Sequence, residues 1–163
     1  MKLDSLDVEL LSLLQRDSKK TARELGSILD MPITTVYAKI KRMEELGLIR
    51  GYKAILDAAK LGFAATAFVL ATFSYRSSQG ADATISQREV AKEVARFAEV
   101  QEVYVISGDW DLLIKVKATD IDAVGRFVVD KLRTVRGIEK TVTCMVFDTA
   151  KETQEISLHG YLS

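Results

Sequence analysis

This chain of 163 residues is poor in cysteine, histidine and proline, with one of each. The single cysteine, Cys144, excludes an internal disulfide and a cysteine-rich metal site, and it suits a reducing cytoplasm. The single histidine, His159, stands alone in a polar C-terminal segment. The sequence shows no P-loop, no metal-ligand spacing and no Ser/His/Asp set. We therefore expect a protein that is not an enzyme and has no cofactor or metal.

Net charge and long apolar runs are also lacking. The 23 lysines and arginines balance 23 aspartates and glutamates, so a uniformly basic nucleic-acid coating protein is excluded. No apolar run approaches the ~18 residues of a transmembrane helix, and the N-terminus has no signal-peptide pattern. The composition, 48% hydrophobic and 28% charged, is typical of a folded soluble domain. We expect a cytoplasmic protein without a membrane partner.

Residues 21–52 have the pattern of two short helices joined by a tight turn. Thr21 opens a T-x-x-E capping box, which marks the start of the first helix. Pro32 separates the two helices, because the residue before a proline avoids helical geometry and proline is tolerated in a first turn. Gly47 falls where glycine commonly ends a helix. Residues 48–56 are expected to form an extended wing strand that packs back on the helices.

The second of these helices is amphipathic, with Val36, Ile40 and Met43 at helical spacing on its inner face. Its outer face is expected to carry a polar and basic set: Thr34, Thr35, Tyr37, Ala38, Lys39, Lys41 and Arg42. Such a face suits the major groove of double-stranded DNA, with the threonines and the alanine near base edges and the adjacent Lys-Arg pair on phosphates. The alternative is a helical hairpin with a solvated charged face, because such patterns also arise by chance.

A further helix is expected to begin at Asp4, which can cap it, and its leucines form a wide apolar stripe. That stripe suits either a small helical core or a partner subunit. The residue pattern changes at 57–62. We therefore expect a winged helix-turn-helix domain over 1–56, a linker at 57–62, and a second domain with a C-terminal tail over 63–163.

The second domain has the order strand, helix, strand, strand, helix, strand. Strands are expected at 64–75, 100–107, 112–118 and 138–147, with a loop at 76–84. Ser86, through an S-x-x-E capping box, and Asp120 would cap the two helices. This is the ferredoxin-like βαββαβ arrangement, so the chain is expected to be α+β. A sheet covered on one face only leaves the other face bare, which favours a homodimer.

The residues between the two middle strands are Gly108, Asp109, Trp110 and Asp111. They are typical of a hairpin turn in which glycine supplies the unusual backbone angles. They also suit an effector pocket, because exposed N–H groups can hold a carboxylate and an aspartate can meet an ammonium. Thr141 and Thr143 would form the second wall of that pocket. Both interpretations stay open on the residues alone.

Two sets of motifs occur in order along the chain. The first comprises Leu3-Asp4, Asp7, Leu14-Gln15, Asp17, Leu25 and Gly47–Tyr52, and the second comprises Ser107–Leu113, Lys115 and Gly137-Ile138. Together they resemble the leucine-responsive regulatory protein / AsnC family of transcription regulators over nearly the whole chain. The resemblance implies a DNA-binding regulator that dimerises, assembles into tetramers, octamers or higher species, and responds to a small-molecule effector, usually an amino acid, bound where dimers meet.

The chain departs from the family pattern at three positions. Pro32 stands where the family usually has serine, and Asp30 stands where it often has glycine. Lys39 replaces a usual arginine, which would remove bidentate contacts from that position. Two other functions remain open. One is an architectural protein that wraps DNA without effector control, and the other is a small-molecule-binding module without DNA activity.

Overall fold

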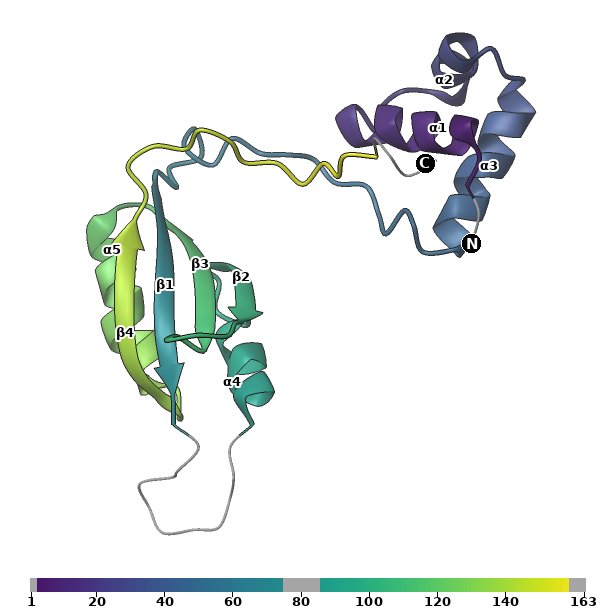
Figure 1. The fold of residues 1–163 in the computed structure, drawn as a ribbon. Helices are drawn as coiled ribbons and strands as arrows, with labels where there is room; N and C mark the ends of the chain where they lie inside the picture. Colours follow the sequence, from purple (N-terminus) through teal and green to yellow (C-terminus); the bar gives the residue numbers. More distant parts are fainter. Residues whose placement is uncertain (1–2, 75–85, 159–163) are drawn as a thin grey trace. The chain divides into compact units, whose positions relative to one another are not determined.

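The computed structural model describes residues 3–74 and 86–158, which form two compact units (Figure 1). One unit holds the chain up to Ile55 together with the C-terminal segment that begins at Lys151, and the other is Leu56–Ala150. The residue pattern predicts that this C-terminal segment belongs to the second domain, whereas its contacts place it with the helical unit. Within the described residues, no helix is long and apolar enough to cross a membrane.

The first unit contains three helices: α1 Ser5–Arg16, α2 Ala22–Leu29 and α3 Ile33–Glu45. Asp4 and Thr21 cap α1 and α2 as predicted, each within a capping box. The apolar stripes meet in one core, whose buried members are Leu10, Leu14, Ala22, Leu25, Leu29, Met31, Val36 and Met43. The leucine stripe of α1 is therefore largely used inside the unit.

The turn between α2 and α3 is tight. Asp30 adopts the left-handed conformation with φ 50°, and Pro32 is the N-cap of α3. A Cβ at Gly26 would lie 2.6 Å from the carbonyl oxygen of Met31, so only glycine lets the turn pass this close to α2. At the other end of α3, Gly47 has φ 71°, as a C-cap glycine requires.

The predicted wing strand is wrong for this chain. Residues 48–56 contain no strand, and all of them are described. Leu48 and Ile49 do pack against the helical core. Ile55 is 93% exposed and Leu56 is 69% exposed, so neither packs back. A strand needs a partner strand for its backbone hydrogen bonds, and residues 3–55 and 151–158 of the helical unit contain none.

The second unit is a four-stranded antiparallel sheet with the order β2-β3-β1-β4. The strands are β1 Ala65–Phe73, β2 Val100–Val105, β3 Leu112–Ala118 and β4 Ile138–Met145. The helical segments are α4 Gln87–Val94, α5 Ile121–Arg126, the π-helical η1 Phe127–Lys131 and the 3-10 turn η2 Leu132–Thr134. The order is that of the predicted ferredoxin-like fold.

The helices cover one face of this sheet. Every second residue of β1 and β3 is buried beneath them, from Ala65 to Phe73 and from Leu112 to Ala118. Phe127 fills the centre of this core and meets Phe97 edge to face, with ring centroids 5.7 Å apart. The strand predicted at 112–118 is thus confirmed with the same bounds.

Three local predictions in this unit need correction. Ser86 is the N-cap of α4, but its side chain makes no capping hydrogen bond, so the capping box is wrong. The helix that Asp120 caps leaves regular α geometry at Phe127, where the turn widens to a π-helix. The strand predicted to reach residue 75 ends at Phe73. Tyr75 and the 76–84 loop lie outside the described residues.

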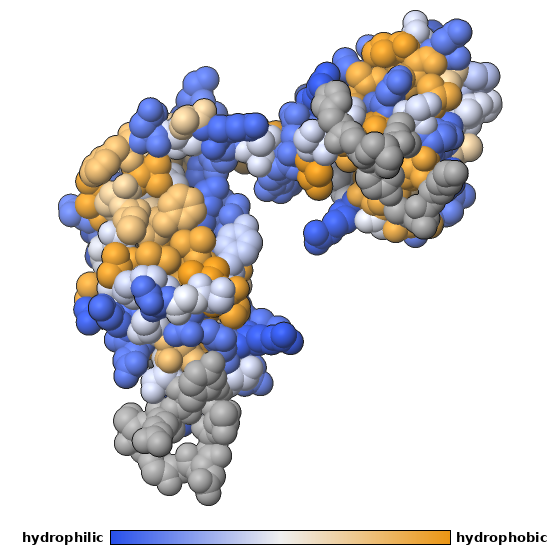
Figure 2. Space-filling view, viewed as in Figure 1, coloured by the Kyte–Doolittle hydropathy of each residue, from blue (hydrophilic) through white to orange (hydrophobic). Residues whose placement is uncertain are grey.

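The other face of the sheet carries half-buried and exposed apolar side chains, and we call it the open face. Register places Phe68 and Leu70 of β1 beside Cys144 and Val142 of β4. Figure 2 shows hydrophobic residues gathered on the face of this unit that is turned to the viewer. Val142 is 38% exposed and Tyr104 is 49% exposed. A patch of this kind is typical of a protein–protein contact.

Candidate DNA-binding helix and effector turn

The outer face of α3 is largely exposed, as a helix that enters a DNA groove requires. Thr34, Tyr37, Ala38, Lys41 and Arg42 are exposed, and Thr35 is half-buried. The N-terminal half of the helix carries the small and hydroxyl side chains, and its C-terminal half carries the charges. This is the arrangement in which base edges and phosphates would be met by different turns of one helix.

Lys39 does not belong to this outer face, and its predicted placement there is wrong. Its side chain is only 14% exposed and turns toward α1. The ammonium lies 2.7 Å from Oδ2 of Asp4 and 2.8 Å from Oδ1 of Asp7. Position 39 falls three residues after Val36 and four before Met43, which puts it beside the apolar stripe. The side chain therefore ends against α1 instead of solvent.

Asp7 is a buried charged residue of the first unit, at 1% exposure. Besides Lys39, its carboxylate accepts the Asp4 N–H at 3.1 Å and lies 3.7 Å from a guanidinium nitrogen of Arg42. A buried carboxylate is tolerated only when it is paired and hydrogen-bonded, and here two basic residues of α3 provide the pairing. Asp7 thus holds α3, the candidate recognition helix, at two successive turns.

The same cluster shifts two pKa values. The hydrogen bond from Lys39, with that from the Asp7 N–H, lowers the pKa of Asp4 below its usual value. Burial alone would lower the pKa of Lys39, but hydrogen bonds to Asp4 and Asp7 outweigh burial and raise it. Both groups are therefore charged at neutral pH. The residue pattern predicts a cap at Asp4 and no function for Asp7. An acid within the leucine stripe of a helix does, however, indicate a buried carboxylate that needs a basic partner.

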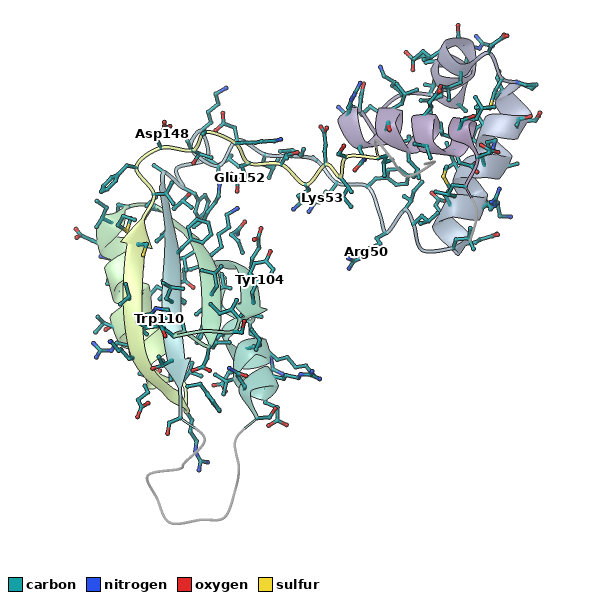
Figure 3. All side chains as sticks on the ribbon, viewed as in Figure 1. Arg50, Lys53, Tyr104, Trp110, Asp148 and Glu152 are labelled. Atoms are coloured by element: carbon teal, nitrogen blue, oxygen red, sulfur yellow. The ribbon has the colours of Figure 1, made fainter. Side chains whose placement is uncertain are left out.

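Basic residues continue past the end of α3. Arg50 and Lys53 are exposed, and Figure 3 shows both side chains pointing away from the chain. Between them, the Tyr52 hydroxyl donates to Glu44 Oε1 at 2.9 Å and ties this segment to α3. Burial and the nearby carboxylate raise the pKa of Tyr52 to about 12. The first unit therefore carries positive side chains both on α3 and on the segment after it.

In the turn of the second unit, Asp111 has a structural task. Its Oδ2 accepts the Phe73 N–H at 2.8 Å, its Oδ1 accepts Nε2 of Gln87 at 2.9 Å, and its own N–H donates to Ala71 at 3.0 Å. These bonds join β3 to the end of β1 and to α4. Gly108 has φ 114°, which a side chain would strain, and Asp109 is exposed.

Thr141 and Thr143 do not form a wall with Trp110. Thr141 pairs with Ala71 and Thr143 with Val69, so both threonines belong to the helix-covered side of the sheet. Trp110 lies instead by Lys140, whose ammonium is 5.3 Å from the ring centroid, and Lys140 alternates with Thr141. Within one chain the six predicted effector residues are therefore split between the two faces.

The turn lines neither of two hollows in the second unit. These hollows, of about 450 and 650 Å³, are lined by residues around Phe127 and Phe147 respectively. Among the residues that the structure describes, no cluster of histidine, cysteine, aspartate or glutamate could hold a metal ion. A ligand at the turn would need walls from elsewhere.

Comparison with known proteins agrees with both units. Residues 3–50 match the winged helix-turn-helix DNA-binding profile, and residues 66–156 match the Lrp/AsnC ligand binding domain. This chain belongs to the Lrp/AsnC family. Like other members, it is a transcriptional regulator with a helix-turn-helix domain and a ligand-binding domain.

Individual relatives match over almost their full length. A helix-turn-helix transcriptional regulator of Pyrococcus abyssi is 40% identical over 150 residues, 92% of this chain and 96% of that protein. A regulator of Neisseria meningitidis, solved in complex with L-methionine, has a TM-score of 0.89 at 25% identity and covers 99% of this chain and 100% of its own. An AsnC family regulator of Agrobacterium tumefaciens has a TM-score of 0.85 at 29% identity, with 96% and 97% covered.

Proposed function

We propose that this Lrp/AsnC regulator binds specific DNA sites through the outer face of α3 and that an amino acid modulates this binding. The observation that carries the proposal is the exposed set Thr34, Tyr37, Ala38, Lys41 and Arg42 on a helix whose back is anchored to α1. The exposed Thr34 and Ala38, together with the half-buried Thr35, would lie nearest base edges. Lys41 and Arg42 would lie on phosphates.

Lys39 takes a different part in this proposal. Because both Asp4 and Asp7 hold its ammonium, it orients α3 instead of reading DNA. The exposed Arg50 and Lys53 would extend the phosphate contacts beyond the helix, which compensates for a neutral chain.

For the effector we retain the Gly108–Asp111 turn. Its support is the exposed Asp109 carboxylate, the Trp110 ring, and a relative that was solved with L-methionine. Since Asp111 is engaged by Phe73 and Gln87, Asp109 is the carboxylate left to meet an amino-acid ammonium. A second subunit would supply the missing wall, so that ligand binding and assembly are coupled.

The proposed assembly is a homodimer formed through the open face, with larger species built from it. Phe68, Leu70 and Leu113 supply half-buried apolar area there, next to the Lys115–Glu102 ion pair at 3.7 Å. Burial at about 25 cal/mol per Å² of apolar surface would stabilise such a pairing. A two-fold axis would also present two recognition helices to a pseudo-palindromic site. The regulator would act in the cytoplasm.

The test measures affinity for DNA from the gene's own promoter with each of the twenty amino acids, alongside thermal-shift screening. A ligand that binds the folded state raises its apparent stability. Amino-acid-dependent affinity supports the proposal, and absence of DNA binding refutes it. Because Trp110 and the threonines predicted as the second wall lie on different faces of the sheet in one chain, a second candidate is an architectural DNA-wrapping protein. Strong DNA binding with no response to any amino acid would favour that alternative.

A further inference from the structure

The side-chain amide of Gln15 holds a segment 141 residues away in sequence. Its Oε1 accepts the Ile156 N–H at 2.8 Å, and its Nε2 donates to the Ile156 carbonyl at 3.2 Å. One amide thus satisfies both backbone groups of one residue, as a neighbouring β-strand would. The Ile156 side chain is 70% exposed, so the recognition is of the backbone.

This contact joins α1 to a segment that the sequence match assigns to the ligand-binding domain. By sequence, the ligand-binding domain runs to residue 156. By contacts, the segment from Lys151 belongs with the helical unit. Figure 1 shows the end of the yellow C-terminal segment beside α1. The chain therefore connects the two units twice, once at Ile55–Leu56 and once at Ala150–Lys151.

The helix that receives the C-terminal segment also holds the recognition helix. Gln15 lies in the last turn of α1, and Asp7 lies in its first turn, paired with Lys39 of α3. The two positions are about 12 Å apart along the helix axis, at about 1.5 Å per residue. An α-helix is stiff over this length. Whatever restrains one end of α1 therefore restrains the other.

We propose that Gln15 docks the C-terminal segment on α1 and that this second connection restrains the recognition helix relative to the ligand-binding domain. The C-terminal segment follows β4 and is held at Ile156 by Gln15. Gln15 and Asp7 both belong to α1, and Asp7 pairs with Lys39 of α3. Both hydrogen bonds are exposed to water, so docking is reversible, as a restraint that can be released must be. A released segment leaves the DNA-binding unit on the Ile55–Leu56 connection alone.

The first test measures docking by amide hydrogen exchange in the peptide that contains Ile156. Gln15→Ala and Ile156→Pro should each speed exchange of the neighbouring C-terminal amides several-fold, because proline has no N–H to donate. Ile156→Ala is the matched control and should exchange like the wild type, since it keeps the N–H. Equal exchange in wild type and Gln15→Ala would overturn the docking.

The second test measures the restraint, and it rests on the proposed DNA binding. Affinity is measured for duplexes that carry one half-site, or two half-sites at several spacings. The wild type should prefer one spacing, whereas Gln15→Ala and Ile156→Pro should flatten that preference several-fold with unchanged affinity for one half-site. An unchanged spacing profile in variants with a released segment would overturn the restraint. If the wild type binds no duplex, the proposed function fails, and hydrogen exchange still decides docking.

Discussion

The ammonium of Lys39 lies 2.8 Å from the buried carboxylate of Asp7, and this pair fixes the recognition helix on α1. Asp7 is inaccessible to solvent and Lys39 nearly so, so their attraction is little screened. If α3 binds DNA as proposed, the pair would contribute to that binding through the orientation of α3.

Asp7→Asn should destabilise the protein by on the order of 3 kcal/mol, because it leaves basic groups without their buried partner. Asp17→Asn is the matched control, since Asp17 pairs with Lys20 at the surface at 3.4 Å, where solvent screens the pair, and this variant should lose much less stability. Urea unfolding measures both. An equal loss of unfolding free energy in the two variants would show that the buried pair contributes no more to stability than the surface pair.

Acid should weaken the same cluster. The pKa of Asp4 is lowered in the folded protein by its hydrogen bonds from Lys39 and the Asp7 N–H. Its contribution to stability is therefore present above the ordinary aspartate pKa and is lost as pH falls through the lowered folded value. Asp4→Asn should reduce the slope of stability against pH in that acidic range. An identical slope in wild type and variant would contradict this assignment.

Arg42→Ala should weaken binding to every duplex and lower the slope of log affinity against log salt by ~1, the value for one lost phosphate contact. Lys60→Ala is the control, because Lys60 is an exposed lysine of the other unit and pairs with Asp57. Binding titrations between low and moderate salt measure the slope. Since Arg42 also lies near Asp7, a thermal melt must show that the variant stays folded.

Thr34→Ala and Thr35→Ala should change the preferred base sequence more than the overall affinity. Both residues lie in the first turn of α3, which in the proposed complex is the part nearest the base edges. Selection of bound duplexes from a randomised pool measures the preference. A preferred sequence that is identical for wild type and both variants would show that α3 enters the groove in another register.

Leu70→Glu should convert the assembled protein into monomers, because it places a charge in the middle of the open face. Val129→Glu serves as the control, since Val129 is 58% exposed on the helical side of the sheet. Light scattering at micromolar concentration measures both sizes. A wild-type monomer would contradict the proposed dimer outright.

Asp109→Ala should abolish amino-acid-dependent changes in assembly size while ligand-free DNA binding stays nearly intact, because α3 belongs to the other unit. Asp122→Ala, at another exposed aspartate of the same unit, should respond normally. A normal response in Asp109→Ala would remove the turn from the effector site. Loss of folding in that variant would leave the turn with a structural task only.

The sequence by itself determined the elements and their order. Some predictions came from local patterns, namely the capping residues Asp4, Thr21 and Asp120 and the break at Pro32. Each marks the start of a helix within a few residues of its observed bounds. Backbone geometry explains this, because caps and periodic burial act over one or two turns or strand pairs.

Only the tertiary structure decided which side chains meet. Lys39 and Asp7 are 32 residues apart in the sequence, and Gln15 and Ile156 are 141 apart. No local spacing therefore predicts either contact. Strand register then placed Thr141 and Thr143 on the side of the sheet away from Trp110, since a shift of one residue exchanges the two faces. Local preference sets the elements, whereas packing and register choose the partners of charged and polar groups.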